Sequence, residues 1–428
     1  MFRLVKKKFR SIEEKDLFYQ LKLHALIYQI LTYKYIHTYL WSKKVKSKLQ
    51  FSSNRILPLQ CLQVSLLICV FYLVFCFSIS NSIASVANTT AEADRFLKQL
   101  LGAEHRGMGG SFVGATEGAN ALGNNPAGIS VTKGDRFVIH MTRFPRTIAQ
   151  ISKPNFNANY EDYSQYELRA SGVETLNWAF PIGKFGTIGF ALSTAHEGAF
   201  RRVNHQGKAL NNFPENNLAI GLGYGLNYFG NTVIGFDAKW LRSKVTDVSG
   251  IEHFGRGYAY NIGLIQKFGN AIQVGLVIRN LSNGLSFVDP TIPDKIRRDV
   301  IAGITYQREI SNTALRLGLD LHPPFSDGIR VNLGTEVWFH DRIGGRIGYL
   351  RDIEKRYTSV FILEDATLKM EERNWKAEGL CLGFGVRFGS IILNAAYTPQ
   401  FMPTVSEDER IHVTQGSAVY AFSIGQDF

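Results

Sequence analysis

Apolar and polar residues alternate with a period of two over most of the chain beyond residue 130. A β-strand sends alternate side chains to opposite faces, so each such run predicts a strand with one bulky apolar face. Short turn signals such as 183–186 and 229–231 separate the runs, which predicts antiparallel hairpins. We count about 14 strand-like segments, and the clearest runs are 175–182, 188–193, 218–226, 234–240, 258–264, 272–278, 315–321, 331–339, 343–349, 380–388 and 420–428.

The second face of these strands favours a membrane barrel over a soluble sandwich. It carries glycine together with charges of both signs, whereas a face exposed to bulk water would be dominated by Lys and Glu with few glycines. A transmembrane barrel turns its apolar face to lipid and a polar, sterically limited face inward. We therefore expect a set of charged side chains to face the lumen, namely Asp237, Lys239, Arg279, Arg316, Asp320, Glu336, Arg346 and Arg387.

The end of the chain and the spacing of its loops support the same fold class. Tyr420, Phe422 and Ile424 share one face of the last run with the terminal Phe428, and we expect this strand to insert and close the barrel. Taken alone, these terminal residues are equally compatible with the last strand of a soluble β-sandwich. Short turns at one rim and long loops at the other are typical of outer-membrane barrels. The charged stretches that we interpret as loops are 197–215, 246–256, 282–296, 352–376 and 398–410.

The net charge of +12 belongs to the N-terminal leader. Residues 1–60 hold 13 of the 48 Lys and Arg and 3 of the 36 Asp and Glu, and residues 61–87 hold no charged residue. Residues 88–428 therefore keep 35 basic and 33 acidic residues. A near-neutral body gives no reason to expect a nucleic-acid partner.

The leader has the pattern of an export signal. Residues 61–87 combine an apolar run from Leu62 to Ile79 with a small-residue exit ending in Ala87, which predicts a signal peptide cleaved after Ala87. The alternative is an uncleaved anchor, since the 18 residues of the apolar run can just span a bilayer. Residues 1–60 form a basic leader, which we interpret as a long n-region or as a start codon assigned too early.

No catalytic or metal-binding pattern occurs in the chain. It lacks a Gly-x-Ser-x-Gly elbow, a Walker loop, a His-Glu-x-x-His motif and spaced cysteine pairs. Three of the four cysteines lie in or beside the leader, so the remaining Cys381 has no partner for an internal disulfide or a multi-thiolate metal site. We expect no enzyme, no catalytic residue, no metal and no cofactor.

Residues 88–130 follow a different pattern and precede the barrel, which we assign to residues 131–428. The run 91–101 predicts a short helix with acidic residues in its first turn. The following residues are rich in Gly and Ala, so they can pack closely but cannot form an independent core. Gly221, Gly223 and Gly225 leave one face of a barrel strand bare, which either permits another backbone to approach or permits the barrel to curve.

Four motifs in this segment resemble the N-terminal signature of the PorV/PorQ family, which is distantly similar to FadL-type fatty-acid transporters. They are Gly102, Gly107–Val113, Ala119–Leu122 and Asn125–Gly128. Gly123-Asn124 departs from the family, whose members often have Tyr-Trp there. The resemblance implies a 14-stranded barrel with an N-terminal hatch folded into its lumen. The hatch motif then comprises Gly107, Met108, Gly109, Gly110, Asn120, Asn125, Pro126, Ala127 and Gly128.

The resemblance also implies a location and two functions. The location is the outer membrane of a diderm bacterium, with membrane lipid and the barrel-assembly machinery as partners. The first function is to bind or pass a hydrophobic small molecule through a hatch-gated lumen. The second is to act as a non-transporting scaffold or shuttle for secreted proteins in a type IX-like secretion system. In either case we expect Asn125, Pro126 and Ala127 to lie among the lumen charges on Arg316, Asp320, Glu336, Arg346 and Arg387.

Overall fold

The structure is a computed structural model of the whole chain. The residues that it describes are Leu97, 102–131, 136–145, 147–154, 161–168, 171–203, 209–228, 230–246, 251–287, 296, 298–322, 330–362, 367–400, 402–404, 410–413 and 418–427. The predictions for the basic leader, the signal peptide, its cleavage site and the terminal Phe428 lie outside these residues, as does the helix at 91–101 except for Leu97. No helix among the described residues is long and apolar enough to cross a membrane.

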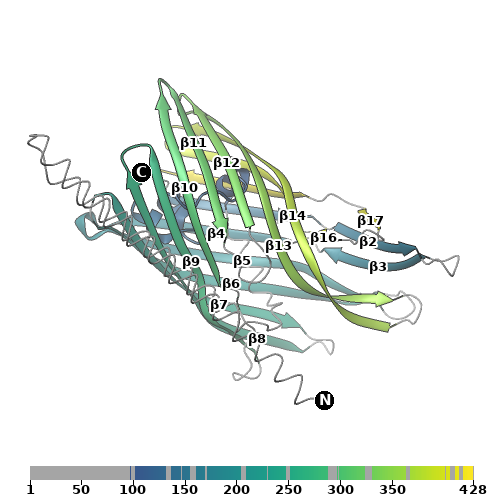
Figure 1. The fold of residues 1–428 in the computed structure, drawn as a ribbon. Coiled ribbons are helices and arrows are strands. Elements are labelled where there is room, and N and C mark those ends of the chain that lie inside the picture. The colour runs from purple at the N-terminus through teal and green to yellow at the C-terminus, as the bar shows by residue number, and fades with distance from the viewer. Residues whose placement is uncertain are drawn as a thin grey trace, which may run out of the picture. The chain divides into compact units, whose positions relative to one another are not determined.

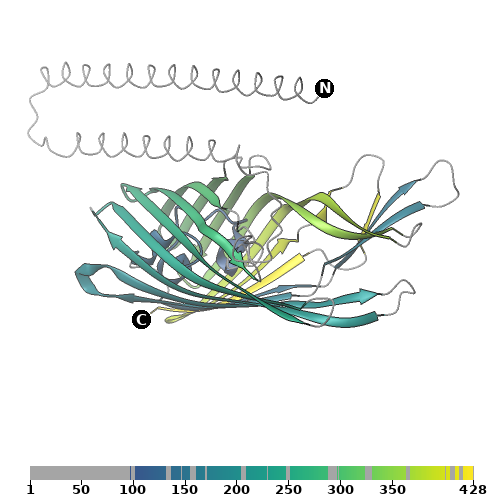
Figure 2. The ribbon, with the colours of Figure 1, turned by 90° about the horizontal axis from the view of Figure 1, so that it is seen from below.

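Fourteen antiparallel strands form a closed ring (Figures 1 and 2). Each strand pairs with its neighbours in the ring, and the β13–β14 pairing completes the circle. The ring confirms the predicted fold class. Its strands are β1 (Phe137–Phe144), β4 (Ser171–Pro181), β5 (Thr187–Val203), β6 (Ala209–Asn227), β7 (Thr232–Thr246), β8 (Glu252–Phe268), β9 (Ile272–Ser286), β10 (Asp299–Ile310), β11 (Thr313–His322), β12 (Arg330–Phe339), β13 (Ile343–Ile362), β14 (Thr367–Phe388), β15 (Ile391–Pro399) and β18 (Ala418–Gln426).

The first and last strands of the ring pair with each other. Phe137 on β1 is opposite Gln426 on β18, and the ladder runs on to Arg143 and Tyr420. β18 also pairs with β15 on its other side, so both of its edges are hydrogen-bonded. Closure of this kind leaves no unpaired edge, which is the condition for strands to cross the hydrocarbon core of a bilayer.

Alternate residues of each ring strand face outward and inward. The outward row is apolar and exposed: Leu317 on β11 is 40% exposed and Phe422 on β18 is 52% exposed. The inward row is buried and contains glycines, apolar residues and polar residues such as Asp320 on β11, which is 1% exposed. An apolar outer surface on a closed ring is what a barrel in lipid requires.

The predicted loops at 197–215 and 352–376 are wrong in part, because paired strands continue through much of them. β13 and β14 remain hydrogen-bonded as far as Ile362 and Thr367, and β5 and β6 remain paired as far as Val203 and Ala209. The alternation of apolar and polar residues is lost in these stretches of the sequence, whereas the hydrogen-bonded backbone ladder continues through them.

A separate three-stranded sheet lies on the long-loop side of the ring. It contains β2 (Thr147–Pro154), β3 (Glu161–Leu168) and β17 (Arg410–Val413), which Figure 1 draws together beyond the ends of the ring strands. The two-residue strand β16 (Met402–Pro403) adds to β14. At the opposite rim the turns are short, as at 269–271 between β8 and β9 and at 389–390 between β14 and β15. The asymmetry of the two rims that the sequence predicts is therefore present.

The chain before β1 folds inside the ring. This inner segment, residues 102–131, contains the helix α4 (Ala103–Gly107) and the 3-10 helices η1 (Gly118–Ala121) and η2 (Pro126–Ser130). Most of its residues are buried, including Met108, Val113 and Asn125. The inner segment and the wall residues that face it form the candidate site.

Candidate functional site: the inner segment and the lumen wall

A belt of glycines on the inner face of the wall carries the inner segment. Several of these glycines are direct neighbours across strands, such as Gly189 and Gly223, Gly235 and Gly263, or Gly334 and Gly348. A Cβ placed on any member of the belt would approach the inner segment within van der Waals contact or closer. The belt consists of Gly189, Gly223, Gly225, Gly235, Gly263, Gly275, Gly303, Gly318, Gly334, Gly348 and Gly383.

The first part of the inner segment follows the belt in reverse strand order. Gly107 lies against Gly383 on β14, Met108 and Gly109 lie against β12 and β13, and Ser111 lies against β11 and β12. Val113 and Gly114 then reach Gly275 on β9. From β14 to β9, the backbone of the inner segment therefore lies directly against the backbone of the wall. A side chain at one of these wall positions would displace the segment.

Met108, Gly109 and Gly110 make the tightest turn of this path. A Cβ on Gly348 would collide with the backbone of Met108 and Gly109. Gly109 and Gly110 have φ values of 66° and 82°, in the left-handed region that favours glycine. The Gly-Met-Gly-Gly sequence thus combines close approach to the wall with a backbone conformation that other residues rarely adopt.

Asn125, Pro126 and Ala127 occupy a different part of the wall from the one expected. They lie against Gly235 on β7 and Gly263 on β8, not among the charges of β11–β14. Asn125 Nδ2 donates to the carbonyl of Val113 at 2.9 Å and to that of Leu264 at 3.3 Å, and its Oδ1 accepts from the Ala127 N–H at 3.2 Å. Asn125 therefore caps η2 and joins two parts of the inner segment to the wall.

Of the three glycines of β6, two face the inner segment and one of these lies against its backbone. Cβ atoms on Gly223 and Gly225 would meet Ile129 and Ser130 of the inner segment. A Cβ on Gly221 would instead meet Ala191 and Lys239 of the wall at 3.4 Å. Close approach by another backbone therefore explains Gly225, and a small neighbouring cavity lies beside Gly221 (see below).

Asp320 binds the inner segment through its main chain. Its Oδ2 accepts the N–H groups of Phe112 at 2.8 Å and Val113 at 2.9 Å. Hydrogen bonds to an ionised acceptor are stronger than those between neutral groups. This contact fixes the inner segment to β11 through main-chain groups, so it does not depend on the side chains of Phe112 and Val113.

An ion-pair network forms a second attachment. Glu336 on β12 lies between Arg346 on β13, with Nε to Oε2 at 2.6 Å, and Arg316 on β11, with Nη1 to Oε1 at 3.2 Å. Arg316 Nη2 also contacts Glu117 of the inner segment at 3.2 Å. The wall thus supplies two guanidinium groups and one carboxylate, and the inner segment supplies a further carboxylate.

Glu104 at the start of the inner segment extends this network. Asn394 on β15 accepts from Arg346 Nη1 at 2.9 Å and donates to Glu104 Oε1 at 2.8 Å. Asn120 Nδ2 donates to the other oxygen of Glu104 at 2.9 Å. Buried charges are tolerable only when they are paired or hydrogen-bonded, and here each member has such a partner.

The other residues predicted to face the lumen have separate partners. Arg279 on β9 donates from Nε to the carbonyl of Asn124 at 2.8 Å. Lys239 and Asp237 pair with each other on β7, and Asn261 Nδ2 donates to Asp237 at 3.0 Å. Arg387 lies with Cζ 5.8 Å from the centre of the Trp338 ring.

A further charged cluster on the long-loop side was not anticipated from the sequence. Arg330, the first residue of β12, contacts Asp299 on β10 at 2.6 Å and Asp352 on β13 at 3.0 Å. His322, the last residue of β11, has Nδ1 3.2 Å from the same oxygen of Asp299. Asp299, His322 and Arg330 each lie at the end of a strand, where the apolar alternation stops and gives no signal, and Asp352 lies within the long strand β13.

The opposite wall on the same side of the inner segment is apolar. Val173, Ala195, Leu241 and Leu285 project inward from β4, β5, β7 and β9 and are buried in one cluster. Leu97 and Ile296 belong to the same cluster although neither lies in a ring strand. On the long-loop side of the inner segment, the lumen therefore has an apolar wall over β4–β9 and a charged wall over β10–β13.

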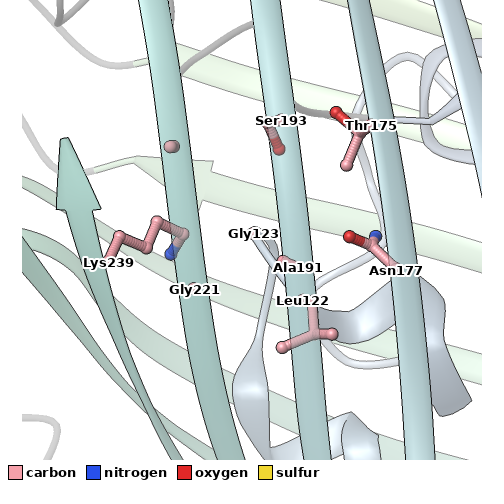
Figure 3. A pocket seen from close by; sticks show the side chains of 9 residues that line it. Leu122, Gly123, Thr175, Asn177, Ala191, Ser193, Gly221 and Lys239 are labelled. Carbon is pink, nitrogen blue, oxygen red and sulfur yellow. The ribbon is translucent and has the colours of Figure 1, made fainter. Parts of the chain in front are cut away.

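A small cavity lies between the inner segment and strands β4–β7 (Figure 3). Its volume is about 10 Å³, roughly the room for one water molecule. Leu122 reaches toward it from the inner segment, and Thr175, Asn177, Ser193 and Lys239 approach it from the wall. Asn177 is 1% exposed, and neither atom of its amide has a hydrogen-bond partner among the described residues.

The terminal strand presents its aromatic row outward. Tyr420, Phe422 and Ile424 on β18 are all exposed on the outer surface of the ring. Tyr397 of the neighbouring strand β15 contacts Tyr420 edge to face with the ring centres 5.9 Å apart. Within the described residues no group of His, Cys, Asp and Glu is arranged to hold a metal ion.

Comparison with known proteins gives no family for the chain. No protein-family model and no curated protein matches it. Similar solved structures include a Pseudomonas aeruginosa FadL homologue and the P. putida toluene transporter TodX, each 12% identical over 76% of this chain and 98% of that chain with a TM-score of 0.46. The CymD monoaromatic hydrocarbon channel is 13% identical over 77% of this chain and 97% of its own, with a TM-score of 0.45.

Proposed function

We propose that the chain is an outer-membrane barrel of a diderm bacterium whose lumen passes a hydrophobic small molecule, with the inner segment as its hatch. The observation that carries the proposal is the apolar inner wall formed by Val173, Leu241 and Leu285 with Leu97 packed on it. A lumen meant only for water and ions would have little use for such a wall. The apolar surface that Leu97 covers has the chemistry to bind an apolar part of a ligand instead of Leu97.

The two walls of the lumen favour a ligand with an apolar body and a polar end. The apolar cluster over β4–β9 and the charged cluster of Asp299, His322, Arg330 and Asp352 both lie on the long-loop side of the inner segment. An amphiphile or a polar-substituted hydrocarbon satisfies both walls at once. A fully polar solute would leave the apolar wall in contact with water.

The contacts of the inner segment suit a hatch that can move while the barrel stays closed. It is attached by the Asp320 carboxylate, by the Glu104 and Glu117 contacts and by packing on glycines. None of these contacts is part of the strand ladders. Opening would therefore break side-chain contacts to the wall and leave the hydrogen bonds between strands intact.

Uptake by intact cells tests this function. Cells that express the chain in a lipopolysaccharide-covered outer membrane should take up radiolabelled oleate or toluene faster than cells without it. Leu241→Asn places an amide in the apolar wall and should slow uptake, whereas Val337→Asn on the outward row of β12 is the matched control for surface expression. Uptake no faster than in cells lacking the chain would contradict the proposal.

A second candidate is a scaffold or shuttle that holds secreted proteins on the long-loop side. The observation that favours it is the length of β13 and β14, which have 20 and 22 residues. A strand needs only about 9–11 residues to cross a bilayer. The extra length and the β2–β3–β17 sheet form a surface beyond the membrane. Cross-linking from these strands to exported proteins, with no effect of Leu241→Asn on uptake, would favour the shuttle over the transporter.

A further inference from the structure

The outer surface of the ring carries a pocket between β7, β8 and β9. Its volume is about 650 Å³, which suits a head group with part of a chain. Trp240, Tyr258, Tyr260 and Leu281 supply aromatic and apolar lining, and Arg256 and Arg298 supply charge. Tyr258 and Tyr260 belong to the outward row of β8, so the pocket opens on the membrane side of the wall and not into the lumen.

Two irregularities in the β8–β9 pairing form this pocket. The register shifts once between Gly257 and Ala259 and again between Tyr260 and Ile262. Asn280 and Gly284 have φ values of 58° and 97° at these points of β9. Bulges bend a strand and change the direction of its side chains. Here they move the side chains of β8 and β9 apart, while the rest of the β8–β9 ladder stays regular.

Among the described residues, the two arginines at the pocket have no anionic partner. Arg256 is directly opposite Arg242 of β7 in the ladder, and like charges in such positions repel. Arg242 lies with Cζ 4.7 Å from the Phe254 ring centre, and the neighbouring acid Glu252 pairs with Lys244. Within the part of the chain that the structure describes, no carboxylate contacts Arg256 or Arg298.

The arginines also lie at the expected height of a lipid head group. A tilted strand crosses the apolar band of about 25 Å in about ten residues. About ten residues along β8 from its short-turn end at Phe268, the strand reaches Tyr258. Arg256 is the next residue on the outward face and therefore lies just beyond the apolar band. Arg298, which immediately precedes β10, lines the same pocket as Arg256. The aromatic lining is then level with the upper part of the acyl chains.

We propose that this pocket binds a phosphate-bearing membrane lipid, with Arg256 and Arg298 on the phosphate and with Tyr258, Tyr260 and Leu281 against the acyl chain. Arginine suits this role because its planar fork donates two hydrogen bonds to one phosphate, and basic pockets beside membrane-spanning segments bind lipid head groups. The inference rests on the membrane location proposed above, but it is independent of transport. It assigns to the β7–β9 wall a structural lipid that offsets the repulsion between Arg242 and Arg256.

Native mass spectrometry of the purified barrel tests the inference. The protein in a non-ionic detergent is titrated with dioleoyl phosphatidic acid, with dioleoylglycerol and with inorganic phosphate. The wild type should retain one phosphatidic acid at low lipid excess and should bind dioleoylglycerol at least tenfold more weakly. The Arg256→Gln/Arg298→Gln variant should lose at least tenfold in affinity for phosphatidic acid.

Two further variants separate the pocket from general lipid binding. Asn283→Trp fills the pocket without changing its charge and should also lose at least tenfold in affinity. Arg351→Gln removes an exposed arginine of β13 outside the pocket and should leave binding unchanged. Retained binding in the Arg256→Gln/Arg298→Gln variant, or an equal loss in Arg351→Gln, would overturn the proposal. Binding of phosphate alone with the affinity of phosphatidic acid would identify a free-anion site and would also overturn it.

Discussion

Asp320 on the barrel wall accepts the backbone N–H of Phe112 at 2.8 Å, so a carboxylate far along the chain holds the inner segment by its main chain. Asp320→Asn makes the acceptor of both N–H groups a neutral amide oxygen. A hydrogen bond to a charged group contributes about 1.5–3 kcal/mol and one between neutral groups about 0.5–1.5 kcal/mol, so the two weakened bonds should together cost about 2 kcal/mol. The segment should loosen while the barrel stays folded.

The measurement for Asp320→Asn is thiol labelling of Thr116→Cys, a buried position of the inner segment, in a background without the four native cysteines. Labelling should become roughly tenfold faster or more, the change that corresponds to about 1.4 kcal/mol. Migration of the unboiled protein in gels should not change. Equal labelling rates in the two proteins would show that Asp320 does not retain the segment.

The glycine belt predicts a position-dependent effect of adding a methyl group. Gly348→Ala would collide with the backbone of Met108 and Gly109, whereas Gly345→Ala on the same strand meets nothing within 4 Å. Overpacking of this kind costs about 1–3 kcal/mol. Gly348→Ala should therefore expose Thr116→Cys to labelling, and Gly345→Ala should leave it protected. If both variants behave alike, the wall glycines serve barrel curvature and not close approach.

The ion-pair network predicts coupling between Arg346 and Glu336. Arg346→Met alone leaves Glu336 and the Asn394–Glu104 contact without their strongest partner. Breaking one partner of a buried pair costs about 3–5 kcal/mol, while replacing both partners costs much less. In a double-mutant cycle with Glu336→Met, denaturant midpoints should show the double variant to be more stable than the additive sum. Additive losses would mean that the two side chains act independently.

The outward face predicts a depth-dependent cost of charge. Leu317→Lys puts an ammonium on the lipid-facing row of β11 near mid-depth and should destabilise the barrel by about 2–4 kcal/mol. Ile310→Lys lies at the short-turn rim, where the cost should be about 0–1 kcal/mol. Reversible unfolding in lipid vesicles measures both. A larger loss for Ile310→Lys would invert the assignment of the membrane boundary.

The sequence predicted the ring because lipid imposes a simple rule on one face of every strand. The outward row must be apolar, so Leu317, Leu333 and Phe422 stand out with a period of two. That rule ends where the strands leave the membrane. The extension of β13 and β14 to Ile362 and Thr367 was therefore mistaken for a loop, because the sequence there no longer alternates between apolar and polar residues.

The path of the inner segment could not be predicted in the same way. Its contacts depend on where a segment without regular period crosses the belt, so Asn125 was expected among the arginines and lies instead at Gly263. Glu104 and Glu117 carry no pattern that separates them from surface acids. Only the glycine-rich inward rows, such as Gly223 and Gly225, indicated that another backbone would approach the wall.

Tethering the inner segment tests the central claim most directly. Val113 of the segment packs against Val277 of β9 in one buried cluster, so Val113→Cys/Val277→Cys, with the native cysteines removed, offers a disulfide between hatch and wall. Our account predicts that oxidation stops uptake of oleate or toluene by intact cells and that a reductant restores it, with each single-cysteine variant unaffected. Uptake at the wild-type rate while the disulfide is present in all molecules would contradict a moving inner segment.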